Sequence, residues 1–107
     1  MTETLFNIGD VKLSGEDVCV LALMMGDSER TYQTIENEAP WVRKALSMLV
    51  IEGIIERSRA DDGMWLNEWT ITSAGVDWTE TPEIQADIAL ANGAFGMFAW
   101  LDILLTS

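Results

Sequence analysis

The sequence of 107 residues predicts one α+β domain, and three observations lead to this fold class. Apolar residues recur over 42–49 with the i, i+3, i+4, i+7 spacing of a helix that buries one face. Two β-prone runs, 54–58 and 64–72, flank the acidic turn 59–63 and predict a hairpin. Hydrophobic residues make up 49% of the chain, enough to fill a core without disulfide bonds.

The first elements are expected to be a short hairpin and a central helix. Residues 5–8 and 11–13 are β-prone and flank Gly9-Asp10, a two-residue hairpin signal. Ser14 is a good N-cap for a helix over about 16–25, with acidic residues in its first turn. That helix is apolar on all sides, which predicts a buried position.

Two further helices are predicted before the hairpin of residues 54–72. Thr31 is expected to cap a short helix over about 32–38, and Pro40 to open a helix that continues to about residue 52. Gly53 then ends this helix. Its expected buried stripe consists of Val42, Ala45, Leu46 and Leu49.

After the hairpin, Thr72 is expected to cap a short segment over 73–78. Residues 81–106 are predicted to form an additional C-terminal helical segment, with Pro82 at its first position and an interruption at Asn92-Gly93. The stretch 94–105 is almost entirely apolar but too short to span a bilayer, which needs about 20 residues.

The middle of the chain resembles the winged-helix domain of MarR-type transcriptional regulators. The resemblance covers residues 31–75, under half of the chain, and is carried by Val42-Arg43-Lys44-Ala45-Leu46, Glu52-Gly53-Ile54-Ile55-Glu56-Arg57, Asp61-Asp62-Gly63 and Thr70-Ile71-Thr72-Ser73-Ala74-Gly75. It implies a winged helix-turn-helix core over 14–78, with three helices and a β wing of two to three strands, in a single domain of residues 1–107.

The resemblance also implies a way of binding DNA and of forming a dimer. The helix from Pro40 would enter the major groove, and the wing would contact the DNA backbone or minor groove. The DNA-contacting residues would be Arg43, Lys44, Ser47, Arg57 and Arg59. Terminal helices build the dimer in that family, so we expect a homodimer formed by the apolar residues Phe95, Met97, Phe98, Trp100, Leu101 and Leu104.

The charge of the chain favours a different use of the same fold. Eighteen acidic and six basic residues give a net charge of −12, and residues 61–107 contain no base. Such a surface repels a duplex and attracts a protein partner with a basic surface. The expected interface residues are Trp41, Asp61, Asp62, Met64 and Trp65. In its size and acidity the chain resembles phage-encoded inhibitors of host defence or host transcription. We therefore carry two hypotheses forward, a protein-binding domain and a DNA-binding repressor.

Catalysis, cofactors and metals are not expected. The chain has no histidine and a single cysteine, Cys19, which is expected to be an inert buried thiol. No nucleophile is paired with a suitable base, and Asp61-Asp62 is expected to be a solvated turn, since two adjacent acids are weak evidence for a metal. The N-terminal residues do not form a signal peptide, which leads us to expect a cytoplasmic protein without membrane contact.

Overall fold

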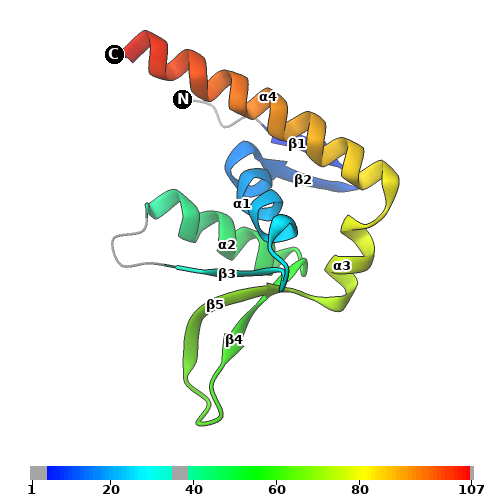
Figure 1. The fold of residues 1–107 in the computed structure, drawn as a ribbon, viewed down its shortest axis with the longest axis vertical. Coiled ribbons are helices and arrows are strands. Elements are labelled where there is room, and N and C mark those ends of the chain that lie inside the picture. The colour runs from blue at the N-terminus through cyan, green and yellow to red at the C-terminus, as the bar shows by residue number, and fades with distance from the viewer. Residues whose placement is uncertain (1–4, 35–38, 107) are drawn as a thin grey trace.

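The computed structural model describes residues 5–34 and 39–106, with side chains up to residue 94. This part of the chain contains four helices and two small antiparallel sheets, so the predicted α+β class is confirmed. Figure 1 shows helix α1 at the centre, between the N-terminal hairpin with α4 on one side and α2 with the larger sheet on the other. The β4–β5 hairpin projects away from the body of the molecule.

The predicted N-terminal hairpin is present as β1 (Leu5–Ile8) and β2 (Val11–Ser14). The two strands form a sheet of their own and do not join the larger sheet. Gly9 lies in the turn with φ of 61°, a conformation that favours glycine. The turn rests on α4, because the Gly9 amide donates a 3.0 Å hydrogen bond to the Asp87 carboxylate.

Helix α1 (Gly15–Gly26) begins as the sequence predicts. Ser14 and Asp17 form a capping box: the Ser14 hydroxyl accepts from the Asp17 amide, and the Asp17 carboxylate accepts from the Ser14 amide. Val18, Leu21 and Met24 are fully buried, as expected for a central helix. One side of the helix reaches solvent, however, since Leu23 is 58% exposed and Cys19 is only partly buried.

The predicted helix start at Thr31 is wrong. Residues Thr31–Gln33 form strand β3, which pairs antiparallel with β5 through Thr31–Thr70 and Gln33–Glu68. Thr31 therefore contacts its strand neighbour, and its hydroxyl lies 3.4 Å from that of Thr70. Thr34, which follows the strand, is not helical either, and residues 35–38, the end of the predicted helix, lie outside the described residues.

Helix α2 (Pro40–Ile51) agrees with the prediction at both ends and on its buried face. The four residues of the expected stripe are buried: Val42, Ala45, Leu46 and Leu49. Gly53, with φ of 77°, ends the helix in a Schellman motif. In this motif the Gly53 amide donates to the Val50 carbonyl and the Ile54 amide to the Leu49 carbonyl.

The larger sheet has the strand order β3-β5-β4. Strands β4 (Ile55–Arg59) and β5 (Trp65–Ile71) form the predicted hairpin, here called the wing. Ile55 lies opposite Ile71 at the base, where both are buried, and Arg59 lies opposite Trp65 near the tip. The pairing is irregular between Arg57 and Arg59. The base of the wing therefore belongs to the core, while its tip extends into solvent.

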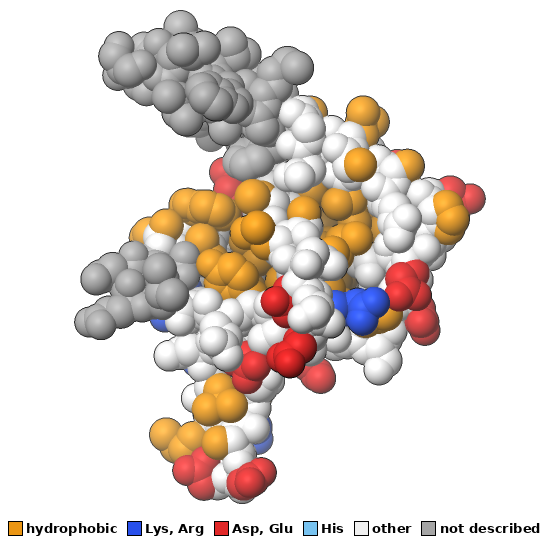
Figure 2. All heavy atoms as spheres, viewed as in Figure 1, with side chains coloured by type: hydrophobic (Ala, Val, Ile, Leu, Met, Phe, Trp, Pro, Cys, Tyr) orange, Lys and Arg blue, Asp and Glu red, His pale blue; other side chains and the backbone are white. Residues whose placement is uncertain are grey.

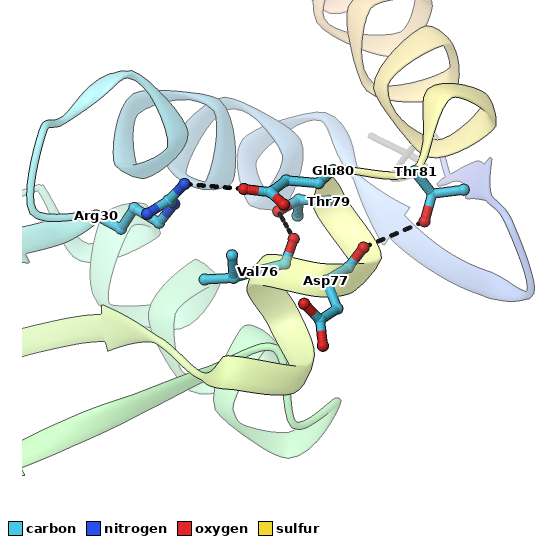
Figure 3. Close-up of polar contacts among 6 residues, drawn as sticks. All are labelled: Arg30, Val76, Asp77, Thr79, Glu80 and Thr81. Atoms are coloured by element: carbon cyan, nitrogen blue, oxygen red, sulfur yellow. Dashed lines mark hydrogen bonds and ion pairs between the residues drawn. The ribbon is translucent and has the colours of Figure 1, made fainter.

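Helix α3 (Ser73–Thr79) is capped by Thr72, as predicted, and α4 (Pro82–Thr106) follows it. Figure 3 shows how the end of α3 is held: Arg30 forms a 3.1 Å ion pair with Glu80, and the Thr81 hydroxyl donates to the Asp77 carbonyl. The predicted interruption at Asn92-Gly93 is wrong, because α4 is a continuous helix of 25 residues. Ile84, Ile88 and Ala91, all of which precede the glycine, pack against the core, and a single glycine inside a helix costs only about 1 kcal/mol.

Candidate functional site

The tip of the wing is a tight acidic turn between β4 and β5. The Ala60 amide donates to the Met64 carbonyl at 2.9 Å, and the Asp62 carboxylate accepts from the Met64 amide at 3.0 Å. Asp61 and Asp62 are both exposed, as expected for a solvated turn. Asp62 therefore shapes the turn while it places a negative charge at the tip.

The two arginines of the wing lie over its tryptophans. The guanidinium carbon of Arg59 is 3.9 Å from the centroid of the Trp65 ring. The guanidinium of Arg57 is 4.9 Å from the Trp69 ring and 5.9 Å from the Trp65 ring. These distances fall within the range of cation–π attraction, which contributes about 0.5–1 kcal/mol at exposed sites. Arg57 thus connects the buried Trp69 with the exposed Trp65.

Arg57 also stabilises the irregular part of the hairpin. Its Nε donates a 2.6 Å hydrogen bond to the Leu66 carbonyl, and a terminal nitrogen donates to the Asn67 side-chain oxygen at 3.0 Å. Leu66 and Asn67 lie where the regular pairing of β4 with β5 is broken. The guanidinium therefore supplies donors to a segment in which ladder hydrogen bonds are disrupted.

Three consecutive residues make the wing tip apolar as well as acidic. Met64 is 67% exposed, Trp65 52% and Leu66 39%. Figure 2 shows hydrophobic side chains beside acidic ones at the end of the wing. Met64 and Trp65 were predicted as interface residues with Asp61 and Asp62, and the structure brings all four together at this tip; Leu66 was not predicted.

The outer face of α2 carries the other predicted residues. Trp41 is 43% exposed, and the solvent-facing side of the helix also presents Arg43, Lys44 and Ser47. The same helix also exposes three apolar residues that were not predicted, Met48, Val50 and Ile51, of which Ile51 is 74% exposed. These three residues fall outside the i, i+3, i+4, i+7 spacing that defines the buried face of the helix. Their exposure could therefore have been predicted from the sequence.

Lys44 lies close to acidic residues of α1. A small hollow of about 80 Å³ separates the start of α1 from α2. Its lining residues are Ser14, Glu16, Asp17, Trp41, Lys44 and Ala45. One of the two bases on the outer face of α2 is therefore placed beside two carboxylates of its own chain.

The elements predicted to contact DNA carry no excess of basic residues. Helix α2 and the wing, residues 40–71, contain four bases against five acids. The bases are Arg43, Lys44, Arg57 and Arg59, and the acids are Glu52, Glu56, Asp61, Asp62 and Glu68. A duplex approaching these elements would meet no excess of positive charge, and the whole chain, with a net charge of −12, would repel it.

The remaining predictions concern the dimer contact, metal binding, membrane contact and Cys19. The expected dimer residues, Phe95 to Leu104, lie on the backbone helix of α4, but their side chains lie outside the described residues. Within the described ranges, no group of three metal-binding side chains is brought together. None of the helices in the same ranges combines the length and apolar character needed to cross a bilayer. Cys19 is only partly buried. The pKa of its thiol is raised, mainly by burial and to a smaller extent by the negative charge of Glu16, and a raised pKa disfavours the reactive thiolate.

These observations define two candidate binding surfaces, the wing tip and the outer face of α2, each with an exposed tryptophan. Exposed tryptophans are typical of protein interfaces, and the two arginines of the wing lie over rings of the same hairpin. The resemblance to MarR-type regulators stays a prediction, because no family model, no curated protein and no solved structure matches the chain significantly.

Proposed function

We propose that this protein is a non-enzymatic, acidic winged-helix domain that binds the basic surface of a partner protein. The proposal rests on one observation, the arrangement of arginines, tryptophans and exposed carboxylates in the wing. Its arginines lie over Trp65 and Trp69, while Asp61, Asp62 and Met64 are exposed at its tip. The winged-helix assignment is supported by a three-stranded sheet whose long hairpin follows α2.

The exposed tryptophans supply the anchors for such an interface. Trp41 and Trp65 are each about half exposed, although their large apolar rings favour burial. Tryptophan is enriched among the few residues that dominate binding free energy in protein interfaces. The negative charge would act mainly on the association rate, by steering a basic partner toward the surface.

A basic protein surface of this kind often serves to bind nucleic acid. A partner that holds DNA or RNA would therefore be blocked by the acidic domain, which is the action of a phage-type inhibitor of host defence or nucleic-acid machinery. The wing tip has two carboxylates beside apolar side chains. This combination supports specific binding to a partner protein better than attraction by charge alone.

The proposal is tested with the purified protein immobilised on a resin. Proteins of a cell lysate that bind heparin are passed over it, and a retained protein is identified by mass spectrometry and purified. We expect duplex DNA to compete with its binding, and Trp41→Ala and Trp65→Ala each to weaken it by at least about tenfold. Lys12→Ala, which alters charge far from this surface in sequence, serves as the control. Failure of every heparin-binding protein to depend on Trp41 or Trp65 would contradict the proposal.

DNA binding is the second candidate function, and one observation favours it. Arg43, Lys44 and Ser47 are all exposed on α2, where the MarR-type resemblance places the DNA-contacting residues. A gel-shift assay with random duplex at low salt separates the two functions. Binding that disappears in the variant Arg43→Ala with Lys44→Ala would support the DNA-binding function and contradict the protein-binding function.

A homodimer formed through the C-terminal part of α4 is a further part of the proposal. It is supported by the apolar sequence of residues 94–105 and by the continuous helix that carries them. Figure 1 shows this end of α4 extending beyond the N-terminal hairpin. Light scattering at high protein concentration tests it, since a mass of one chain, 11.9 kDa, would contradict a dimer.

A further inference from the structure

The exposed tip of the wing is connected to the core through side-chain contacts along the hairpin. Trp69, 6% exposed, lies within the core, and Arg57 lies over its ring. Arg57 also donates to the Leu66 carbonyl and the Asn67 side chain, which follow Trp65 directly. Arg59 then lies over the Trp65 ring from the opposite strand. The position of the exposed indole is thus supported by two arginines.

Such support matters for binding because ordering a mobile side chain on association costs free energy. A tryptophan already held in one orientation loses less freedom when a partner covers it. A phosphate-binding arginine, by contrast, has to present its donors to the ligand. In the wing, the donors of Arg57 are directed to the hairpin itself, and Arg59 is stacked on an indole.

The chemistry of the tip identifies the kind of pocket it fits. Met64 and Trp65 offer a contiguous apolar surface, and Asp61 and Asp62 lie beside them in the turn. The apolar pair requires an apolar pocket, since burying it against polar groups would gain little. The adjacent carboxylates require basic side chains at the rim of that pocket, because burial without a cationic partner is unfavourable.

We propose that the wing is a preformed docking hairpin for a protein pocket with an apolar floor and a basic rim, and that Arg57 and Arg59 are positioning residues for Trp65. Met64 and Trp65 enter the pocket, while Asp61 and Asp62 pair with the rim. The inference rests on the proposed protein-binding function and adds the chemistry of the partner's pocket and a role for the two arginines.

The positioning role is tested by NMR on the ¹⁵N-labelled protein without any partner. The heteronuclear NOE of the Trp65 indole N–H reports how strongly the ring is held. Arg59→Met is expected to lower this NOE, and Arg59→Lys, which retains a cation, to lower it less. Arg43→Met removes the same charge from α2 and is expected to leave the NOE unchanged. An unchanged NOE in Arg59→Met, or an equal decrease in Arg43→Met, would overturn the positioning role.

The docking role is tested with a designed amphipathic helical peptide that carries lysines on one face and leucines on the other. We expect it to shift the Trp65 indole and Met64 methyl signals, whereas an oligolysine of equal charge leaves both unshifted. Trp65→Ala is expected to weaken peptide binding by at least about tenfold. Arg59→Met is expected to weaken it about two- to fivefold, and Lys12→Met, which removes an exposed positive charge from β2, to have no such effect.

Two outcomes would overturn docking by the wing: peptide shifts confined to other residues, or equal shifts of Trp65 with oligolysine. Neither result depends on capturing a natural partner. If the lysate experiment yields a partner that depends on Trp41 but the peptide avoids Trp65, the proposed function stands and the docking hairpin fails. The opposite result is a lower Trp65 NOE in Arg59→Met and a shift of Trp65 with the peptide, but no heparin-binding protein retained from the lysate. In that case the proposed function fails and the docking hairpin stands.

Discussion

The backbone amide of Gly9 donates a 3.0 Å hydrogen bond to the carboxylate of Asp87, 78 positions further along the chain. This contact joins the turn of the N-terminal hairpin to α4. We expect Asp87→Ala to lower the free energy of unfolding by about 1 kcal/mol, because the amide loses a charged acceptor. Urea denaturation measures the change. Asp77→Ala, which removes an exposed carboxylate from α3, is the control, and an equal loss in both variants would contradict a specific role for Asp87.

Gly75 is expected to tolerate no side chain. A Cβ at this position would overlap the carbonyl oxygen of Ile54 and approach a methyl group of Ile71 within 2.8 Å. The Ile54 carbonyl cannot retreat easily, since it accepts hydrogen bonds from the amide and hydroxyl of Thr72. Gly75→Ala should therefore destabilise the domain by about 2–3 kcal/mol, measured by urea or thermal unfolding.

Gly93 provides the opposite case in the same kind of experiment. It lies inside α4, and a Cβ there would meet nothing within 4 Å. Gly93→Ala should raise the free energy of unfolding by about 0.5–1 kcal/mol, because alanine restricts the unfolded chain and favours helix. A loss of stability in Gly93→Ala would show that the helix requires a glycine at this point.

The thiol of Cys19 should react slowly at neutral pH. Burial raises its pKa above the ordinary value, and the carboxylate of Glu16, one turn earlier on α1, raises it further. The rate of alkylation by iodoacetamide should therefore rise at a higher pH in the native protein than in urea, since only the thiolate reacts. Glu16→Gln should move the midpoint of the native curve downward. An unchanged midpoint would assign the shift to burial alone, and Glu29→Gln serves as the control.

The two tryptophans of the wing should differ in what they contribute to stability. Trp69 is 6% exposed and belongs to the core, so Trp69→Ala should cost about 3–5 kcal/mol. Trp65 is 52% exposed, and Trp65→Ala should cost about 1 kcal/mol, mainly from the loss of its contact with Arg59. Thermal unfolding of both variants measures the difference. Similar losses would mean that the tip is as much a part of the fold as the base.

Elements with a strong local signal were predictable from the sequence. The cap at Ser14, the proline at the start of α2 and the glycine after it are local devices, and each lies where the sequence places it. The buried stripe of α2 was predictable for the same reason, because helical periodicity determines which residues share a face.

Elements defined by distant contacts were not predictable. Thr31 has the properties of an N-cap, yet Thr31–Gln33 pair with β5 as a strand. A strand of three residues is stabilised by the neighbouring strand rather than by its own sequence. Asn92-Gly93 is typical of a helix break, but the cost of a glycine in a helix is only about 1 kcal/mol, and α4 continues through it over 25 residues.

The composition of the candidate surface was predictable, but its internal contacts were not. Trp65, Met64 and the two aspartates follow from the position of the turn. The placement of Arg59 over Trp65 depends on the register of the hairpin, and the irregular pairing between Arg57 and Arg59 sets that register. Both arginines were predicted to contact DNA on the resemblance to MarR-type regulators, since the rings beside them follow from the folded hairpin and not from the sequence.

The bridge that Arg57 forms between Trp69 and Trp65 makes the fold itself a reporter of binding. A ligand that covers the wing tip engages a segment coupled to the core, so it favours the native state over the unfolded one. At a ligand concentration 100 times the Kd, such binding adds about 2.7 kcal/mol to the free energy of unfolding. The melting temperature of this domain, followed through its five tryptophans, can therefore be used to screen basic proteins for the one it recognises.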